Sequence, residues 1–246
     1  MDLIKTKGLV LRSVTIGDFD KMLTVLTTDL GRISVLAKGA KSLKHGGGAS
    51  TGVFCYSDFV LYPKKEIYTV SQASGIECFF GLTQDLPLLE CAAALVAFAD
   101  FVSEDLQDGG DILRITLNSL YGLSALHKPP LQVLCVFYLK TLSVLGFSPE
   151  LAGCAACGSE EDLPFFSVEY GGAVCADCAE NLPNQTPLSS DTLLLMRYIV
   201  CCDIKQLFKF EADEPNLRAA YRILLSFLSE HLDYRPKQSV LSPDTE

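Results

Sequence analysis

The strongest constraint on the fold is a pair of Cys-x-x-Cys motifs in the second half of the chain. Cys154 and Cys157 form the first motif, Cys175 and Cys178 form the second, and 17 residues separate the two. A two-residue spacer lets both sulfurs of one motif reach the same ion, and two motifs complete a tetrahedron of thiolates. Four thiolates leave no position for water or substrate. The spacing therefore predicts a structural zinc finger within residues 149–182.

The other cysteines do not repeat this spacing. The first residues of the chain mix charged and apolar positions, unlike a secretory signal, so we expect a reducing cytoplasm and no disulfides. The apolar segment 131–147 is interrupted by Gln132 and Lys140 and is too short to span a membrane, so we expect a buried core helix there. The remaining cysteines are expected to be small buried hydrophobic residues. They are Cys55, Cys78, Cys91, Cys135, Cys201 and Cys202.

Charge is divided unevenly along the chain. The whole chain has a net charge of −10, which by itself argues against nucleic acid as a partner. Residues 1–80, however, hold 10 Lys and Arg against 7 Asp and Glu, a net of +3, whereas residues 81–246 hold 10 against 23, a net of −13. This asymmetry predicts a basic working module joined to an acidic one.

The two halves also differ in hydrophobic periodicity. Five short β-prone runs occupy the first 75 residues, with a turn at 28–31 that predicts a hairpin and a glycine-rich loop over 38–51. This pattern favours a closed barrel of the oligonucleotide-binding (OB) type, with an SH3-like barrel as the alternative. Helical spacing follows residue 81 at 88–102, 112–126, 131–147 and 214–232. We predict an α+β protein with an OB-fold domain over 1–80 and, over 81–246, a helical domain that carries the zinc finger.

The predicted barrel contains a basic segment. No acidic residue occurs from Leu30 to Ser57, and cations lie along a strand end and the glycine-rich loop. An OB barrel binds single strands through a basic groove and stacking aromatic rings. Phe54, Tyr56 and Tyr62 share strand parity but suit a barrel interior equally well, so we favour the cations. The finger, in contrast, has no Lys or Arg between Lys140 and Arg197, and we do not expect it to hold DNA.

Several motifs together resemble the RecO family of bacterial recombination mediators over essentially the whole chain. They are Gly8-Leu9-Val10-Leu11-Arg12, Gly17-Asp18-Phe19-Asp20-Lys21 followed by Leu-Thr-Val-Leu-Thr, Gly31-Arg32-Ile33, Ala37-Lys38-Gly39-Ala40-Lys41, and the later Cys-x-x-Cys-Gly. The family is similar in layout, with an OB-fold, a helical domain and an inserted zinc finger.

The resemblance implies a protein without covalent chemistry that binds single- and double-stranded DNA and anneals complementary strands. It also implies partnership with RecR and with the C-terminal tail of single-stranded-DNA-binding protein, to help load RecA, near the nucleoid and away from membranes. The candidate DNA-binding residues are Arg12, Lys21, Arg32, Lys38, Lys41 and Lys44. The cations available for an acidic partner tail are Arg197, Lys205, Lys209, Arg218 and Arg222.

Two other functions compete with this interpretation. An enzyme is disfavoured because the three histidines, His45, His127 and His231, have no metal-ligand spacing and no phosphate-binding glycine loop is present. A protein-interaction adaptor with an SH3-like barrel remains the alternative. After Lys41 the family pattern often continues with basic residues, whereas here glycines follow His45. We therefore expect modest, strongly salt-dependent DNA affinity.

Overall fold

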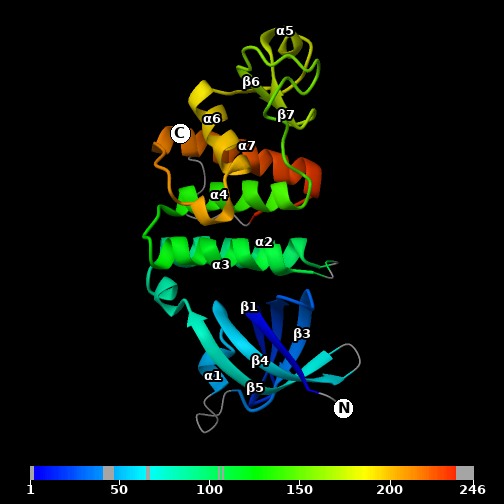
Figure 1. Cartoon of the computed structure of the whole chain (residues 1–246), viewed down its shortest axis with the longest axis vertical. Coiled ribbons are helices and arrows are strands. Elements are labelled where there is room, and N and C mark those ends of the chain that lie inside the picture. The colour runs from blue at the N-terminus through cyan, green and yellow to red at the C-terminus, as the bar shows by residue number, and fades with distance from the viewer. Residues whose placement is uncertain (1–2, 41–46, 65–66, 105, 107, 237–246) are drawn as a thin grey trace. The chain divides into compact units, whose positions relative to one another are not determined.

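The computed structural model describes residues 3–40, 47–64, 67–104, 106 and 108–236 (Figure 1). It divides into two compact units, Met1–His127 and Lys128–Glu246. The barrel ends at residue 78, and the two helices that follow it belong to the first unit together with the barrel. The first unit therefore extends beyond the predicted barrel boundary at residue 80.

Five strands form a closed barrel in the first unit. Their order around the barrel is β1-β2-β3-β5-β4, and β3 and β5 run parallel while the other neighbours are antiparallel. This arrangement confirms the predicted OB-type barrel. The strands are β1 (Ile4–Ile16), β2 (Asp20–Thr27), β3 (Arg32–Ala37), β4 (Cys55–Lys64) and β5 (Ile67–Cys78).

The barrel interior follows from the alternation of side chains along each strand. Leu23 and Val25 of β2 are fully buried, as is Val35 of β3, whereas Met22, Thr24 and Leu36 beside them are only half-buried. The predicted hairpin joins β2 to β3. Gly31 has a φ of 62°, which the tight turn requires, and the hydroxyl of Thr27 donates to its carbonyl at 2.8 Å.

The glycine-rich segment between β3 and β4 is only partly as predicted. We expected no regular structure over 38–51, but the short helix α1 (Gly47–Ser50) lies within this range. The backbone carbonyl of Ser50 accepts a 2.8 Å hydrogen bond from the hydroxyl of Ser57 on β4, which fixes the helix against the barrel. Residues 41–46 of the segment lie outside the described residues.

The expectation of no disulfides is wrong, and only two of the six cysteines predicted to be small buried hydrophobic residues fit that prediction. Cys55 and Cys78 form a disulfide, since they lie directly opposite each other on β4 and β5 with a Cα–Cα distance of 4.1 Å. Spacing alone does not reveal which residues a strand register brings together. Cys201 is exposed and Cys202 is half-buried, whereas Cys91 and Cys135 are buried as expected.

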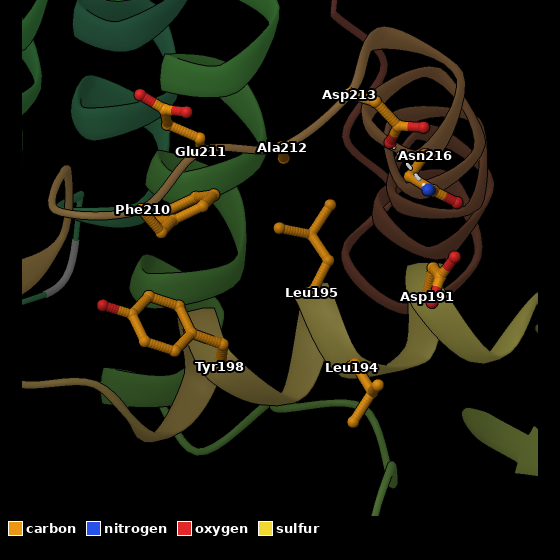
Figure 2. A pocket seen from close by; sticks show the side chains of 9 residues that line it. All are labelled: Asp191, Leu194, Leu195, Tyr198, Phe210, Glu211, Ala212, Asp213 and Asn216. Atoms are coloured by element: carbon orange, nitrogen blue, oxygen red, sulfur yellow. Dashed lines mark hydrogen bonds between the residues drawn. The ribbon is translucent and has the colours of Figure 1, made fainter.

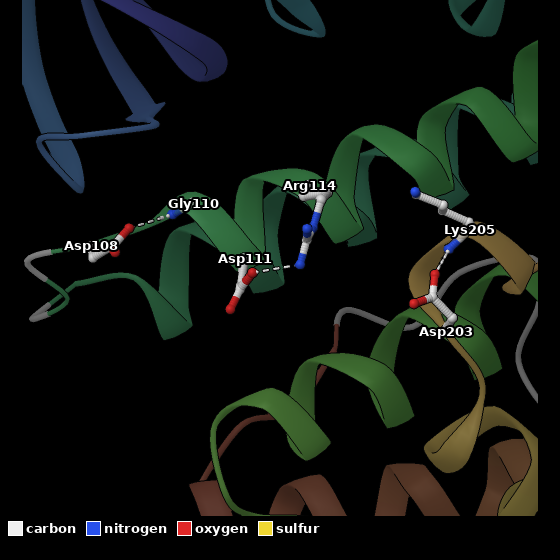
Figure 3. Close-up of polar contacts among 6 residues, drawn as sticks. All are labelled: Asp108, Gly110, Asp111, Arg114, Asp203 and Lys205. Atoms are coloured by element: carbon white, nitrogen blue, oxygen red, sulfur yellow. Dashed lines mark hydrogen bonds and ion pairs between the residues drawn. The ribbon is translucent and has the colours of Figure 1, made fainter.

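A 3₁₀ turn, η2 (Phe80–Gln84), and two helices, α2 (Leu86–Val102) and α3 (Gly110–Ser124), complete the first unit. Asp85 caps α2 by accepting from the Leu88 N–H at 3.1 Å. At the start of α3, Asp108 accepts from the Gly110 N–H at 2.9 Å and Asp111 pairs with Arg114 at 2.8 Å (Figure 3). Acidic side chains at this end stabilise the helix through its dipole.

The second unit is built around the helix α4 (Pro130–Val144), which packs against α6 (Ser190–Cys201) and α7 (Glu214–Leu232). Every residue from Gln132 to Leu142 is buried, which confirms the predicted core helix. The ammonium of Lys140 donates to the carbonyls of Val200 and Cys202 at 2.8 and 2.6 Å, so the buried lysine closes the C-terminal end of α6. Among the residues that the structure describes, we find no helix with the length and apolar character to cross a membrane.

The remaining elements of this unit are short. Asp203 begins the 3₁₀ turn η3 (Ile204–Gln206) by accepting from the backbone N–H of Lys205 at 2.8 Å; Figure 3 includes both residues. The predicted finger contains one helical turn and two strands of a small sheet of order β7-β6-β8, whose third strand β8 lies just beyond residue 182. These elements are β6 (Phe165–Ser167), β7 (Gly172–Val174), α5 (Ala176–Ala179) and β8 (Thr186–Pro187).

Candidate metal centre and nucleic-acid surface

The two Cys-x-x-Cys motifs meet at one point of the second unit. The sulfurs of Cys154, Cys157, Cys175 and Cys178 all lie within 4.8 Å of one another. Cys154 is buried and Cys157 is exposed, and the other two are half-buried. Four thiols at such distances form a set of ligands that could hold one tetrahedral metal ion.

Backbone hydrogen bonds shape each motif around this point. The N–H of Cys154 donates to the carbonyl of Ser159 at 2.7 Å, and the N–H of Gly158 donates back to the Cys154 carbonyl at 2.8 Å. Gly158 has a φ of 79°, so the glycine after the first motif permits a left-handed turn. The second motif runs from the end of β7 into α5, and the Cys175 N–H points to the sulfur of Cys154 at 3.4 Å.

The thiols of the cluster differ in acidity. Burial raises the pKa of Cys154, but the backbone N–H groups of Cys175, Cys157 and Ala156 outweigh it and lower the pKa to about 6. Hydrogen bonds with the thiols of Cys175 and Cys157 raise the pKa of Cys178 to about 12. The backbone thus favours a thiolate at Cys154, and a metal ion replaces the remaining protons when it binds.

Gly172 of β7 is predicted to stabilise the finger because it has no side chain. It is buried against Glu150, and a Cβ atom at Gly172 would lie 2.7 Å from the Cβ of Glu150 and closer still to its carbonyl. Because this contact is with backbone, we expect Gly172→Ala to destabilise the second unit by about 1–3 kcal/mol. Thermal unfolding checks this, with Gly81→Ala as control since a Cβ there has open space. An unchanged melting temperature would contradict the prediction.

The surface of the finger does not suit DNA. Residues 149–182 contain several Asp and Glu residues but no Lys or Arg. The nearest later cation, Arg197, donates to the carbonyls of Leu151 and Ala152 at 2.6 and 3.0 Å and so fixes the segment before the first motif. The segment that carries the cysteine cluster is therefore poorly suited to contact phosphates.

Two of the candidate DNA-binding cations lie at one end of the barrel. Lys21 at the start of β2 is paired with Ala37 at the end of β3, and the exposed Lys38 follows directly. The N–H of Gly39 donates to the carboxylate of Asp20 at 2.8 Å, which holds the segment carrying Lys38 beside β2. Arg12 is exposed on β1, farther along the same strand pair.

The other predicted cations behave differently. Arg32 lies at the opposite end of β3, where its guanidinium forms an ion pair with Asp100 of α2 and approaches Glu104 at 3.8 Å. This ion pair joins β3 of the barrel to α2. Because the Arg32 side chain is only 28% exposed, little of it remains accessible to a phosphate. Lys41 and Lys44 lie outside the described residues.

The aromatic residues considered from the sequence do not form a shared surface. Phe54 is buried, Tyr56 is half-buried and only Tyr62 is well exposed. Sequence reasoning missed Phe19, which lies between β1 and β2 and is 62% exposed. Its position between Asp18 and Asp20, shortly after Gly17, was the available signal.

The second unit also contains an acidic pocket of about 400 Å³. Figure 2 shows Leu195 and Tyr198 on α6 facing Phe210, with the carboxyl groups of Glu211 and Asp213 on the segment that leads to α7. Phe210 packs edge-on against Tyr198 with ring centroids 5.1 Å apart. Carboxylates at the rim repel phosphates and acidic peptides alike.

Comparisons with known proteins cover nearly the whole chain. Residues 1–79 match the model of the family described as "Recombination protein O N terminal", and residues 83–239 match "Recombination protein O C terminal". The chain is similar to the "DNA repair protein RecO" of Acetivibrio thermocellus, with 35% identity over 95% of this chain and 93% of the relative. The protein of the same name from Caldicellulosiruptor bescii is 36% identical over 93% of each chain.

Proposed function

The chain belongs to the RecO family of DNA repair and recombination proteins, and from this we propose that it is a non-catalytic mediator that binds and anneals DNA strands. It binds single- and double-stranded DNA through the barrel. Together with RecR it helps to load RecA onto strands coated by single-stranded-DNA-binding protein. It acts in the cytoplasm, at the nucleoid.

The observation that carries this proposal is that three candidate cations lie on two neighbouring strands of an OB-type barrel and on the segment that follows the third. Lys21 and Lys38 lie at the same end of the β2–β3 pair, which the Gly39–Asp20 hydrogen bond holds together, and Arg12 lies farther along the adjoining strand β1. Lysine and arginine neutralise phosphates without reading sequence, so the DNA interaction is expected to be general. Arg32 contributes to the fold through Asp100, which leaves these three as the proposed phosphate contacts among the described residues.

A second pocket supports binding of the acidic tail of single-stranded-DNA-binding protein. It has a volume of about 460 Å³, and Leu151, Val200 and Pro149 give it an apolar lining next to Arg197. Its one acidic lining residue, Glu150, accepts from the N–H groups of Ala152 and Gly153. Arg197 uses part of its five-donor guanidinium on backbone carbonyls, and its other donors suit a carboxylate. The acidic pocket beside Phe210 lacks this complementarity.

The metal of the four-cysteine cluster is proposed to be zinc, since four sulfur ligands suit Zn²⁺. A bound zinc ion supplies charge neutralisation and a fixed crosslink between the two motifs. Cys154, Cys157, Cys175 and Cys178 saturate it, so the proposed role is structural and no reaction step is assigned to it.

Annealing of complementary oligonucleotides coated with single-stranded-DNA-binding protein tests the proposed function. We expect the full chain to accelerate annealing at low salt, because cations on the barrel neutralise phosphates on both strands. Fluorescence quenching between labelled strands reports the rate, with protein-free strands as control. No acceleration, together with no binding to bare strands, would favour the adaptor alternative.

A further inference from the structure

The outer face of the barrel carries an apolar row across three strands. In register, Val14 of β1 lies opposite Met22 of β2, and Met22 lies opposite Leu36 of β3. Directly opposed residues share one face of a sheet. The alternate residue Leu23 on β2 points into the core, so the row of Val14, Met22 and Leu36 faces outward.

This row continues to the tip of the β1–β2 hairpin. Ile16 lies two residues beyond Val14 on the same face, and Phe19 lies in the turn. Val14 is 46% exposed, Ile16 is 43% exposed and Phe19 is 62% exposed. β1 is paired with β4 only from Ile4 to Leu9, so the hairpin extends past its neighbour on that side. We call Val14, Ile16, Phe19, Met22 and Leu36 the hairpin row.

The hairpin row is bordered by charge that suits a nucleic acid. Arg12 precedes Val14 on the same face, and the exposed Lys38 follows Leu36 after the end of β3. Of the acids at this tip, Asp20 accepts from the Gly39 N–H, and Asp18 is exposed. Cations at both edges of an exposed apolar strip match a polymer with anionic backbone and flat apolar bases.

We propose that the hairpin row is a stacking surface for the unpaired bases of single-stranded DNA, with Phe19 as its main contact. The inference rests on the proposed function and deepens it. Bases within a duplex already stack on one another and present no free face to a protein ring. The hairpin row therefore confers a preference for single strands, whereas Arg12, Lys21 and Lys38 act on both forms of DNA.

The first test replaces Phe19 by alanine in the full chain. Stacking on an aromatic ring is worth about 1–3 kcal/mol per base, so we expect affinity for a single-stranded oligonucleotide to fall by about fivefold or more. Affinity for a duplex of the same length is expected to stay within about twofold, a difference well below 1.4 kcal/mol. Phe19→Tyr keeps a ring and should retain the single-strand affinity. Because the side chain is exposed, unchanged thermal unfolding of each variant serves as the folding control.

The second test uses the lack of tryptophan in this chain. Phe19→Trp introduces a single indole, and its fluorescence is expected to be quenched when single-stranded oligonucleotide is added but not when duplex is added. Tyr170→Trp is the matched control, since Tyr170 is an exposed ring of the second unit, on the acidic finger, which is not expected to bind DNA. We expect little quenching there.

The outcomes separate this inference from the function on which it rests. If the unaltered chain binds no DNA, the proposed function fails. If it binds and Phe19→Ala leaves single-strand affinity unchanged, or weakens single-strand and duplex binding equally, the stacking surface is wrong. Equal quenching at positions 19 and 170 contradicts it as well.

Discussion

Replacing Cys154 and Cys157 together by serine is expected to abolish metal binding and to unfold the finger over residues 149–182. Structural zinc contributes about 10–16 kcal/mol to the folding of small fingers. Whole domains are stable by only about 5–15 kcal/mol. The short strands of the finger bury one large aromatic side chain, Phe166, which packs on Phe227 of α7, and this packing replaces only part of that contribution. The two sulfurs left on Cys175 and Cys178 do not complete a tetrahedral site.

The measurement combines metal content per chain with limited proteolysis of the finger. Cys201→Ser is the control, because Cys201 is an exposed cysteine of the same unit outside the cluster. We expect this control to keep one zinc ion and the protease resistance of the unaltered chain. A double-serine variant that retained both would show that the cluster is not the metal site.

Replacing Arg12, Lys21 and Lys38 by alanine is expected to produce the largest loss of DNA affinity. Each phosphate contact on a single strand contributes about 0.7 to the slope of log K against log salt. Removing three contacts therefore lowers the slope by about 2, which at about 0.1 M salt corresponds to a loss of about a hundredfold. Unrelated oligonucleotide sequences should lose affinity about equally, since phosphate contacts carry no sequence information.

The matched control removes the same charge from the second unit. Lys205, Lys209 and Arg222 are exposed there, and their replacement by alanine changes the net charge equally. We expect the slope to remain that of the unaltered chain. Equal losses in the two triple variants would mean that overall charge, rather than the barrel end, governs binding.

Periodicity and turn chemistry were sufficient to predict the barrel, the hairpin at Gly31, the core helix α4 and the last helix α7. The helix α6 was missed, although Ser189 caps it and Leu193, Met196 and Ile199 are buried at helical spacing. The four cysteines of the candidate metal site could be predicted without knowing any strand register, because the two-residue spacing alone allows each pair to bind one ion.

The residues that could not be predicted depend on contacts between distant strands and helices. The disulfide of Cys55 and Cys78 follows from the register of β4 and β5, which a sequence does not specify. The sequence predicted Arg32 as a phosphate contact, but in the fold Arg32 forms an ion pair with Asp100 of α2. Similarly, the hairpin row becomes visible only when Met22 and Leu36 are known to lie opposite each other.

The most direct test of the DNA-binding barrel is the affinity of the unaltered chain for a single-stranded oligonucleotide, measured over a series of salt concentrations. We predict that log K falls linearly with log salt, with a slope of about −2 or steeper, because Arg12, Lys21 and Lys38 each contact a phosphate. Absence of binding at low salt, or binding that does not change with salt, would contradict a barrel that holds DNA by its phosphates.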